Sequence, residues 1–356
     1  MSYSTLFIPD ISGFTHFVKN TEINHGRHII QELIDIIIHE GSKIFQVAEI
    51  EGDAVFFYSI DKVLTLAEIE EKARHMYHAF HQHLLLYEQK RICNCGACST
   101  AINLKLKFIT HAGEITLVDF AADKGKPYGE AVIAVHRLLK NKIGIKEYLL
   151  FSDTYLTDQA FKADGHGTYH DKELGDVSFQ YKEINQWMEG IDFEAIRRES
   201  QPSEITASYA SQILFTIDLV HQFISDFRYR HLWNSEADQI IFDESKINQV
   251  GAEHYCIVNG QNLSFDTIKP KVEAPNQRSY GEVLKNPAPF RYFETNFILS
   301  EVNERETGVE MRMSVSFKWV WQRLMKNIIK KKLEKKAAEI LNEMARALTE
   351  NVKQVA

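Results

Sequence analysis

Hydrophobic positions in the first half of the chain alternate between helical and strand periods. Apolar residues recur at helical spacing over residues 28–39, 64–89 and 128–142, which predicts three helices. Short runs rich in Val, Ile, Phe and Tyr lie around them and are typical of strands. The predicted strands are residues 5–9, 43–50, 54–59, 104–110, 114–120, 148–151 and 177–184.

Two pairs of neighbouring strands are predicted to form hairpins. Gly52-Asp53 separates the second strand from the third, and Ala112-Gly113 separates the fourth from the fifth. Glycine next to a polar or small residue is a common turn sequence between two strands. The resulting order of elements indicates an α+β sheet covered by helices, in the manner of a split βαβ motif.

The second half has a different pattern, in which many strands precede one long helix. A polar stretch, residues 186–204, contains Ser200-Gln201-Pro202-Ser203 and is interpreted as a linker. It divides the chain into predicted domains over residues 1–185 and 205–356. Residues 219–227 form a predicted short helix and residues 319–353 a long one. The predicted strands are residues 209–217, 238–243, 254–258, 263–269, 279–284, 292–300 and 308–317.

Composition is compatible with two domains and excludes some function classes. The chain has 356 residues, of which 44% are hydrophobic and 25% charged, and its net charge is -8. This acidity argues against binding to nucleic acid. No apolar run is long enough to form a transmembrane segment, and the first residues lack the pattern of a secretory signal. Free cysteines are expected in a reducing compartment, so we expect a cytoplasmic protein.

Two carboxylates near strand ends are candidates for a metal site. Asp10 follows the first strand, and Asp53 lies at the tip of the first hairpin. Divalent ions such as magnesium or manganese prefer hard oxygen ligands, and two such ions can activate a hydroxyl and stabilise a leaving pyrophosphate. Gly13 allows close approach of backbone at the start of a helix, where N–H groups can bind phosphate. Taken alone, an aspartate after a strand such as Asp10 is usually a helix cap, and a Gly-Asp pair such as Gly52-Asp53 is usually a turn.

These residues resemble the catalytic domain of class III nucleotidyl cyclases. The first motif, residues 7–15 (FIPDISGFT), is similar to the family's F-x-D-I-x-G-F-T signature, and Gly52-Asp53 is similar to its G-D turn. Residues 128–138 (YGEAVIAVHRL) resemble the G-D-x-V-N-x-A-x-R-L segment, and residues 149–152 match the strand that follows. The resemblance implies a ferredoxin-like domain that pairs head to tail as a homodimer.

The resemblance also implies roles for particular residues. Asp10 and Asp53 would hold Mg or Mn, with help from the carbonyl of Ile11, and Arg137 would stabilise transition-state charge from the partner subunit. The backbone of the turn after the first strand would bind the phosphates of a nucleoside triphosphate. The residues of that turn are Ser12, Gly13, Phe14 and Thr15.

Three positions depart from the family pattern. The ribose-binding asparagine is replaced by Ile133, the base-reading lysine by Val47, and the other base-reading residue by Lys126. The leading hypothesis is therefore a signalling or sensor protein whose cyclase-like domain binds metal and nucleotide with little or no turnover. The alternatives are an active cyclase with atypical base recognition and an interaction module that binds no nucleotide.

Three of the four cysteines lie within six residues. Cys95 and Cys98 have the C-x-x-C spacing of two thiolates on one tetrahedral zinc ion, and Cys93 can supply a third ligand. His83, His111 or a dimer partner can complete the set. A redox-active pair or an inert loop explains the same pattern.

Residues 203–356 resemble the START-like (SRPBCC) superfamily, a helix-grip fold that encloses a cavity for lipids or other hydrophobic molecules. The resemblance rests on the order of elements and on Leu232-Trp233-Asn234. A basic run, Lys330-Lys331-Lys332, lies on the last helix and is usually a solvated face, although it also suits anionic lipid or nucleotide. Candidate pocket residues, each equally a core residue, are Trp233, Phe265, Phe297, Met313, Phe317 and Trp321.

Overall fold

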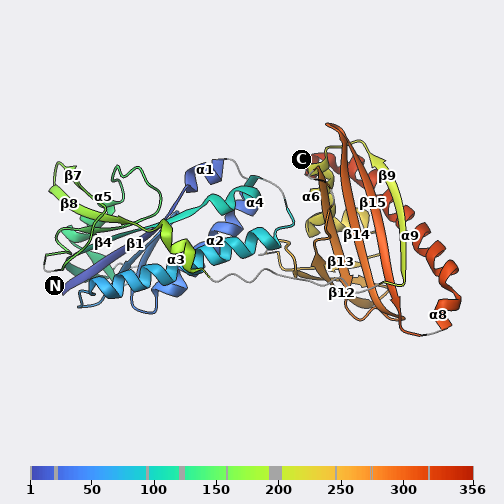
Figure 1. Ribbon diagram of the computed structural model, residues 1–356, viewed down its shortest axis with the longest axis horizontal. Coiled ribbons are helices and arrows are strands. Elements are labelled where there is room, and N and C mark those ends of the chain that lie inside the picture. The colour runs from blue at the N-terminus through green and yellow to red at the C-terminus, as the bar shows by residue number, and fades with distance from the viewer. Residues whose placement is uncertain are drawn as a thin grey trace. The chain divides into compact units, whose positions relative to one another are not determined.

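The computed structural model divides the chain into two compact units (Figure 1). The first unit comprises Met1–Glu88 and Thr100–Glu194, and the second comprises Gln89–Ser99 and Ala195–Ala356. The division after Glu194 falls inside the stretch interpreted as a linker. Gln89–Ser99, which the sequence analysis placed in the first domain, groups with the second unit. The structure describes residues 2–19, 23–93, 96–119, 125–157, 159–191, 203–244, 247–272, 274, 276–319 and 321–355.

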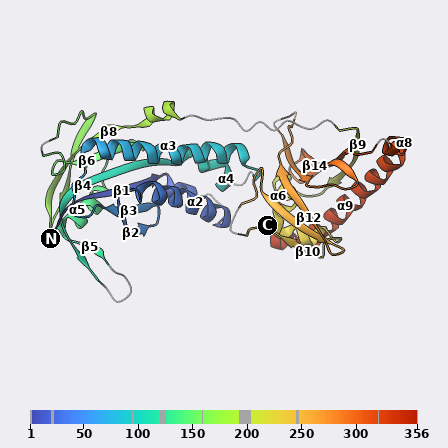
Figure 2. The ribbon, with the colours of Figure 1, turned by 90° about the horizontal axis from the view of Figure 1, so that it is seen from below.

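An 8-stranded sheet forms the centre of the first unit. Its strands are β1 (Ser2–Ser12), β2 (Gln46–Glu51), β3 (Ala54–Tyr58), β4 (Lys105–Val118), β5 (Lys126–Tyr128), β6 (Tyr148–Ser152), β7 (Gly165–Asp171) and β8 (Gly175–Glu183). Their order is β2-β3-β1-β4-β6-β8-β7, with β5 paired to β4. The helices are α1 (Phe14–Lys19), α2 (Ile23–Gly41), α3 (Leu66–Lys90), which runs alongside the sheet in Figure 2, and α5 (Glu130–Leu138).

Strand β1 has apolar residues on both faces because helices cover both sides of the sheet. On one side, Leu6 and Ile8 pack with Ala131 and Val135 of α5. On the other, Phe7 stacks at centroid distances of 5.1 Å on Phe45 and 5.6 Å on Phe108. Since successive side chains alternate, Asp10 shares the α5 face with Leu6 and Ile8.

The predicted second hairpin is wrong, because β4 is one continuous strand through Gly113. A Cβ added at Gly113 would lie 2.6 Å from Cβ of Ala131. Glycine at this position therefore allows helix α5 to pack close to β4, and it does not form a turn. The predicted helix over residues 128–142 is also shorter, since Lys126–Tyr128 pairs with β4 as strand β5. Strand β7 was not predicted, because most of its side chains are polar or small.

The second unit contains a 7-stranded antiparallel sheet and a long helix. Its strands are β9 (Ile205–Ile213), β10 (Gln239–Ile241), β11 (Glu253–Val258), β12 (Gln261–Ile268), β13 (Gln277–Leu284), β14 (Phe290–Asn303) and β15 (Glu306–Phe317). Their order is β10-β11-β12-β13-β14-β15-β9. The helices are α4 (Gly96–Thr100), of which all but the last residue belongs to this unit, α6 (Ile217–Ser225), α7 (Arg230–Trp233), α8 (Trp321–Leu324) and α9 (Lys326–Val355).

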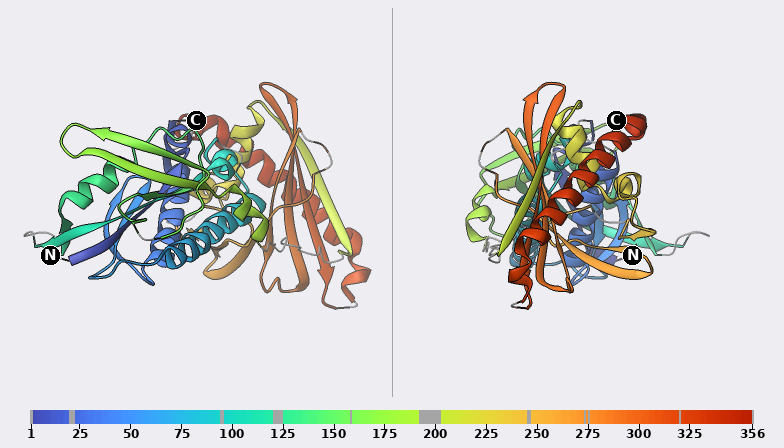
Figure 3. Two further views of the ribbon diagram at one scale, coloured as in Figure 1. Left: turned by 60° about the vertical axis from the view of Figure 1, so that its left-hand side comes forward. Right: turned by 90° about the vertical axis from the view of Figure 1, so that its right-hand side faces the viewer.

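Helix α9 lies across one face of this sheet, as Figure 3 shows. Its apolar side chains, including Leu341 and Met344, form one buried cluster with Phe223 of α6 and Phe297 of β14. The single helix predicted over residues 319–353 is two helices, α8 and α9. Both units mix sheets and helices, so the predicted α+β class is confirmed. Among the described helices, none has the length and apolar composition needed to cross a bilayer.

The contact between Gly113 and Ala131 generates a stability prediction. We expect Gly113→Ala to lower the free energy of unfolding by about 1–3 kcal/mol, because the new methyl group overlaps the Ala131 side chain. Chemical denaturation followed by circular dichroism measures this change. Gly144→Ala is the control, since a Cβ at Gly144 meets nothing within 4 Å. Equal stability of the two variants would contradict the proposed close approach.

Candidate metal and nucleotide site

Backbone pairing of β1 with β3 brings Asp10 and Asp53 to the same end of two neighbouring strands. Asp10 lies opposite Ala54, the residue after Asp53. The backbone N–H of Ile11 donates to the carbonyl of Asp53 at 3.0 Å. Gly52 has a φ of 66°, which allows the tight turn that precedes Asp53. The two carboxylates, far apart in sequence, are thus held by adjacent main chain.

The environment of the two carboxylates opposes their ionisation. Burial raises the pKa of Asp10, although the neighbouring ammonium group of Lys107 counteracts part of this effect. Burial and, secondly, the negative charge of Asp10 raise the pKa of Asp53 to about 6. Like charges held together in a partly desolvated place repel each other, and a bound cation relieves that repulsion.

Lys107 is the member of this site that the sequence analysis missed. It lies on β4 directly opposite Asp10. Its Nζ is 3.4 Å from Oδ2 of Asp10, and the exposed fractions of the two side chains are 20% and 16%. Alternation of polar and apolar residues in β4 indicates that Lys107 faces the opposite side from Leu106 and Phe108, but only the strand register reveals its partner.

The expected phosphate-binding turn connects β1 to α1. Strand β1 continues through Ser12, and Gly13 has a φ of 93°, a conformation that favours glycine. Phe14 begins α1, and the N–H of Phe17 donates to the carbonyl of Gly13 at 3.0 Å. Gly13 and Thr15 are exposed at this turn, whereas Ser12 is buried.

The donor set fits a hard divalent cation. The side chains of Asp10 and Asp53 offer carboxylate oxygens, and the backbone of Ile11 offers a carbonyl in the same stretch. Magnesium and manganese prefer such oxygen ligands to nitrogen or sulfur. Among the described residues, Lys107 is the cation paired with Asp10, so a metal ion would exchange with its ammonium group or lie beside it.

The positions expected to read base and ribose lie near a groove of about 470 Å³. Val47 and Ile133 are exposed by 38% and 48%, and neither side chain can form a hydrogen bond. Lys126 donates to the carbonyl of Ala48 at 2.5 Å. Lining residues of the groove are Ala48, Glu49, Phe56, Lys126, Pro127, Tyr128, Val132 and His136.

Two neighbouring residues of α5 make different contacts. Nε of Arg137 lies 2.9 Å from Oδ2 of Asp171 on β7, so this arginine is ion-paired within its own subunit. His136 packs edge-on against Phe56, and its Nε2 lies 3.4 Å from a carboxylate oxygen of Glu51. The predicted role of Arg137 in a partner's site requires that it leave Asp171.

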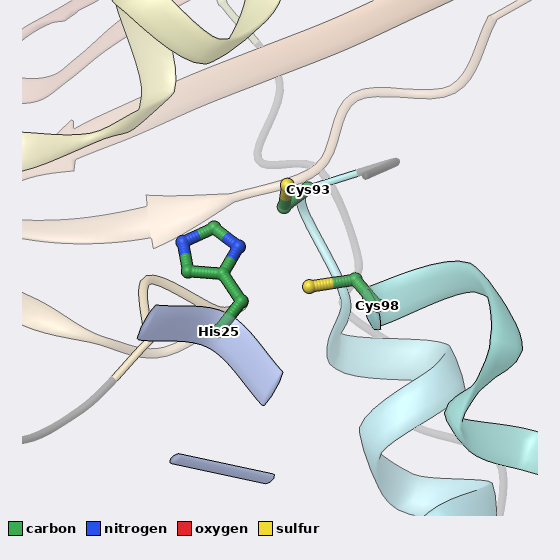
Figure 4. Close-up of side chains that lie close together, drawn as sticks. All are labelled: His25, Cys93 and Cys98. Atoms are coloured by element: carbon green, nitrogen blue, oxygen red, sulfur yellow. The ribbon is translucent and has the colours of Figure 1, made fainter. Parts of the chain in front are cut away.

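The cysteine segment is part of the second unit. Ile92 belongs to that unit's buried cluster, and the carbonyl of Lys90 accepts from the N–H of Val250 at 2.8 Å. The Sγ atoms of Cys93 and Cys98 lie within 4.8 Å of each other (Figure 4). The third residue labelled in Figure 4, His25, belongs to the first unit.

The two histidines expected as further zinc ligands each contact another group of the first unit. Cys95 lies outside the described residues. His83 contacts Glu32 at 3.0 Å, and Nδ1 of His111 lies 2.7 Å from Oγ of Ser152. Zinc at Cys93, Cys95 and Cys98 therefore stays a prediction, with two thiols in a compatible arrangement.

Most of the candidate pocket residues of the second unit are interior. Trp233, Phe297 and Met313 belong to its main buried cluster, and Phe317 belongs to a smaller one. Phe265 stacks on His254 with ring centroids 5.2 Å apart. Trp321 differs, because it lies on the short helix α8 and is 55% exposed.

A polar cluster that the sequence analysis missed lies inside the second unit. Arg230 and Glu282 form an ion pair and are each 4% exposed. The hydroxyl of Tyr280 donates to Glu282 at 2.5 Å and accepts from Arg230 at 3.2 Å. His254 is fully buried 3.6 Å from Glu282, and burial lowers its pKa to about 2. Among the described residues, Nε of Arg230 and both ring nitrogens of His254 have no hydrogen-bond partner.

The raised pKa of Asp53 predicts how stability depends on pH. Between pH 4 and about 6 the folded chain keeps a proton on Asp53 that the unfolded chain has lost. Stability from this group is therefore present at low pH and is lost as the pH rises through 6. We expect Asp53→Asn to raise the melting temperature more at pH 7.5 than at pH 4.5, measured by calorimetry. An equal effect at both pH values would contradict the raised pKa.

The buried ion pair of the second unit predicts a non-additive effect. Arg230→Met or Glu282→Met alone should cost about 3–5 kcal/mol, because each leaves one buried charge without its partner. The double variant should cost less than either single variant, since both charges are gone. Urea unfolding of the four proteins measures this double-mutant cycle. Additive losses would show that the two side chains do not interact as described.

Comparison with protein families gives one match, to "Protein of unknown function (DUF2652)", over residues 30–148. Among curated proteins, the chain is similar to "Uncharacterized protein Rv2561/Rv2562" of Mycobacterium tuberculosis (strain ATCC 25618 / H37Rv). The two are 28% identical over 160 residues, which cover 43% of this chain and 72% of the relative.

Solved structures similar to each part of the chain include a cyclase domain and a START protein. The guanylyl cyclase Cya2 is 16% identical, with a TM-score of 0.38, and the match covers 50% of this chain and 90% of that one. A START superfamily protein from Mycobacterium smegmatis is 20% identical, with a TM-score of 0.31, over 42% of this chain and 99% of that one.

Proposed function

We propose that the first unit is a nucleotide-binding module of a signalling or sensor protein, which binds a nucleoside triphosphate through a divalent cation at Asp10 and Asp53. The observation that supports this proposal most is the pair of adjacent carboxylates, one of which has its pKa raised to about 6 by burial and by the charge of the other. A carboxyl group whose pKa is shifted by burial and by a like charge is a candidate for a functional site.

Each residue of the site has a separate task in this proposal. Asp10 and Asp53 hold the ion, and exposed backbone N–H groups of the turn at Gly13 and Thr15 donate to phosphate oxygens. Lys107 leaves the carboxylates when the ion binds and can then contact a phosphate group. The ion neutralises phosphate charge when it is bound. In a head-to-tail dimer, Arg137 would reach the partner's phosphates only after exchanging Asp171 for them.

Turnover is expected to be slow or absent because the groups that orient base and ribose are missing. Ile133 and Val47 offer no hydrogen bond, and Lys126 already donates to a backbone carbonyl. Loss of one preorganised polar contact commonly lowers a rate by about 10²–10³. One observation favours the alternative of an active cyclase: the groove beside these positions contains Glu49 and His136, whose polar side chains suit contacts to a base.

The second unit is proposed to bind a hydrophobic molecule or lipid that carries one hydrogen-bond acceptor. Its interior contains large apolar side chains such as Phe297 and Met313. Buried donors at Arg230 and His254 lack partners among the described residues, and an unpaired buried donor is costly. A carboxylate, carbonyl or hydroxyl oxygen of a ligand would satisfy them.

Binding of manganese and a non-hydrolysable triphosphate tests the first proposal. Calorimetry should show triphosphate binding that requires Mn²⁺ and is lost in Asp10→Asn and in Asp53→Asn. Metal affinity should increase as the pH rises through 6, because Asp53 must lose its proton to bind the ion. Binding that is unchanged in both variants would contradict the proposal.

A second variant distinguishes competition from coordination at Lys107. Lys107→Met should raise the affinity for Mn²⁺, because the ion no longer displaces an ammonium group from Asp10. Lys105→Met on the same strand is the matched control, since Lys105 lies by Glu147. Assays for cyclic nucleotide from ATP and from GTP with Mn²⁺ complete the test. Turnover abolished by Asp10→Asn would establish the cyclase alternative.

A further inference from the structure

An exposed apolar surface lies where β15 ends and the two last helices begin. Five large side chains are exposed there, by 53% for Trp319, 55% for Trp321, 89% for Leu324, 39% for Met325 and 53% for Ile328. We call these five residues the tryptophan patch; two of them, Trp321 and Leu324, belong to α8, which is labelled in Figure 1. A contiguous exposed apolar patch commonly marks an interaction surface.

The patch continues into a shallow groove of about 340 Å³. Trp321 and Met325 line this groove together with Phe290, Ile329 and Leu333. The last three also belong to, or pack against, a small buried cluster around Val315 and Phe317. Apolar surface therefore extends without interruption from the interior of the second unit to the solvent.

Buried and paired side chains hold the patch in place. The side-chain oxygen of Gln322, which is 1% exposed, accepts from the N–H groups of Lys318 at 2.9 Å and Trp319 at 2.8 Å. Its amide nitrogen donates to the carbonyl of Pro289 at 3.1 Å. Arg323 forms an ion pair with Glu204 at 2.5 Å. Gln322 of α8 thus fixes the backbone of Lys318 and Trp319 at the end of β15.

Positive charge surrounds the patch, although the whole chain has a net charge of -8. Residues 318–336 contain eight Lys or Arg residues and one acidic residue, Glu334. Four of the eight are paired with a carboxylate, namely Arg323, Lys330, Lys335 and Lys336. Lys331, Lys332 and Lys335 follow Ile328 by three, four and seven positions, which places them on the same face of α9. All three lysines are exposed.

We propose that the tryptophan patch and the lysines around it dock the second unit on an anionic membrane surface. Tryptophan side chains favour the interface between water and acyl chains. Insertion of aliphatic side chains such as Leu324 and Ile328 into the acyl boundary is favourable, and lysines are attracted to anionic headgroups. Binding to nucleic acid or to an acidic protein would explain the lysines, but it would not explain the exposed leucine and isoleucine side chains.

Vesicle sedimentation tests the docking proposal on the full chain. The protein should sediment with vesicles of phosphatidylcholine and phosphatidylserine, and not with phosphatidylcholine alone. Binding should weaken as salt concentration increases. Tryptophan fluorescence should shift to shorter wavelength on binding, because Trp319 and Trp321 leave water.

Three double variants test the apolar patch, the lysines beside it and a distant pair of lysines. Leu324→Asp with Ile328→Asp, and separately Lys331→Glu with Lys332→Glu, should each lower partitioning by about tenfold or more. Lys162→Glu with Lys172→Glu, which changes two exposed lysines of the first unit by the same charge, should leave it unaltered. All three variants should keep their affinity for Mn²⁺, so failure of this proposal is distinguishable from failure of the nucleotide site.

Several outcomes would overturn the proposal. They are absence of sedimentation with anionic vesicles, equal binding to neutral vesicles, and full binding by the Leu324→Asp and Ile328→Asp double variant. Binding to a DNA or RNA duplex without vesicle binding would assign the lysines to nucleic acid instead. An equal loss of vesicle binding in the Lys162→Glu and Lys172→Glu double variant would show that binding depends only on net charge.

Discussion

Pairing of the central strand β1 with β3 on one side and β4 on the other is the constraint on which the candidate site depends. It places Asp10 beside the turn that contains Asp53 and opposite Lys107. Both strand pairs are fixed by apolar side chains on two faces, since a shift of one residue would turn Phe7 and Ile8 to the wrong helices. The carboxylates are therefore brought together by the same packing that stabilises the fold.

Each unit holds charges that its own core partly desolvates, and each balances them differently. In the first unit the ammonium group of Lys107 pairs with Asp10 beside a second carboxylate, that of Asp53, and this pairing leaves an excess of negative charge that suits a cation. In the second unit Arg230 and Glu282 neutralise each other within apolar surroundings. Among the described residues, Nε of Arg230 and the ring nitrogens of His254 have no hydrogen-bond partner. We therefore propose a metal and phosphate ligand for the first arrangement and an apolar ligand with one acceptor group for the second.

Much of the fold was accessible from the sequence, because most strands and helices have clear hydrophobic periods. The continuous strand β4 was not, since a glycine that admits a neighbouring helix at Ala131 has the same local sequence as a turn. Strand β7 lacks apolar alternation and depends on pairing with β8. The motifs identified Asp10 and Asp53, whereas Lys107, the contact of Arg137 with Asp171 and the buried pair Arg230–Glu282 depend on strand register or on contacts distant in sequence.

We propose that Asp10 and Asp53 together hold a divalent cation in competition with Lys107. A crystal structure of the protein grown with Mn²⁺ above pH 7, with anomalous scattering recorded near the manganese edge, tests it most directly. We expect a strong anomalous peak between the carboxylates of Asp10 and Asp53, with Nζ of Lys107 moved away from Asp10. A map without a peak there, in which Lys107 keeps its ion pair with Asp10, would contradict the account.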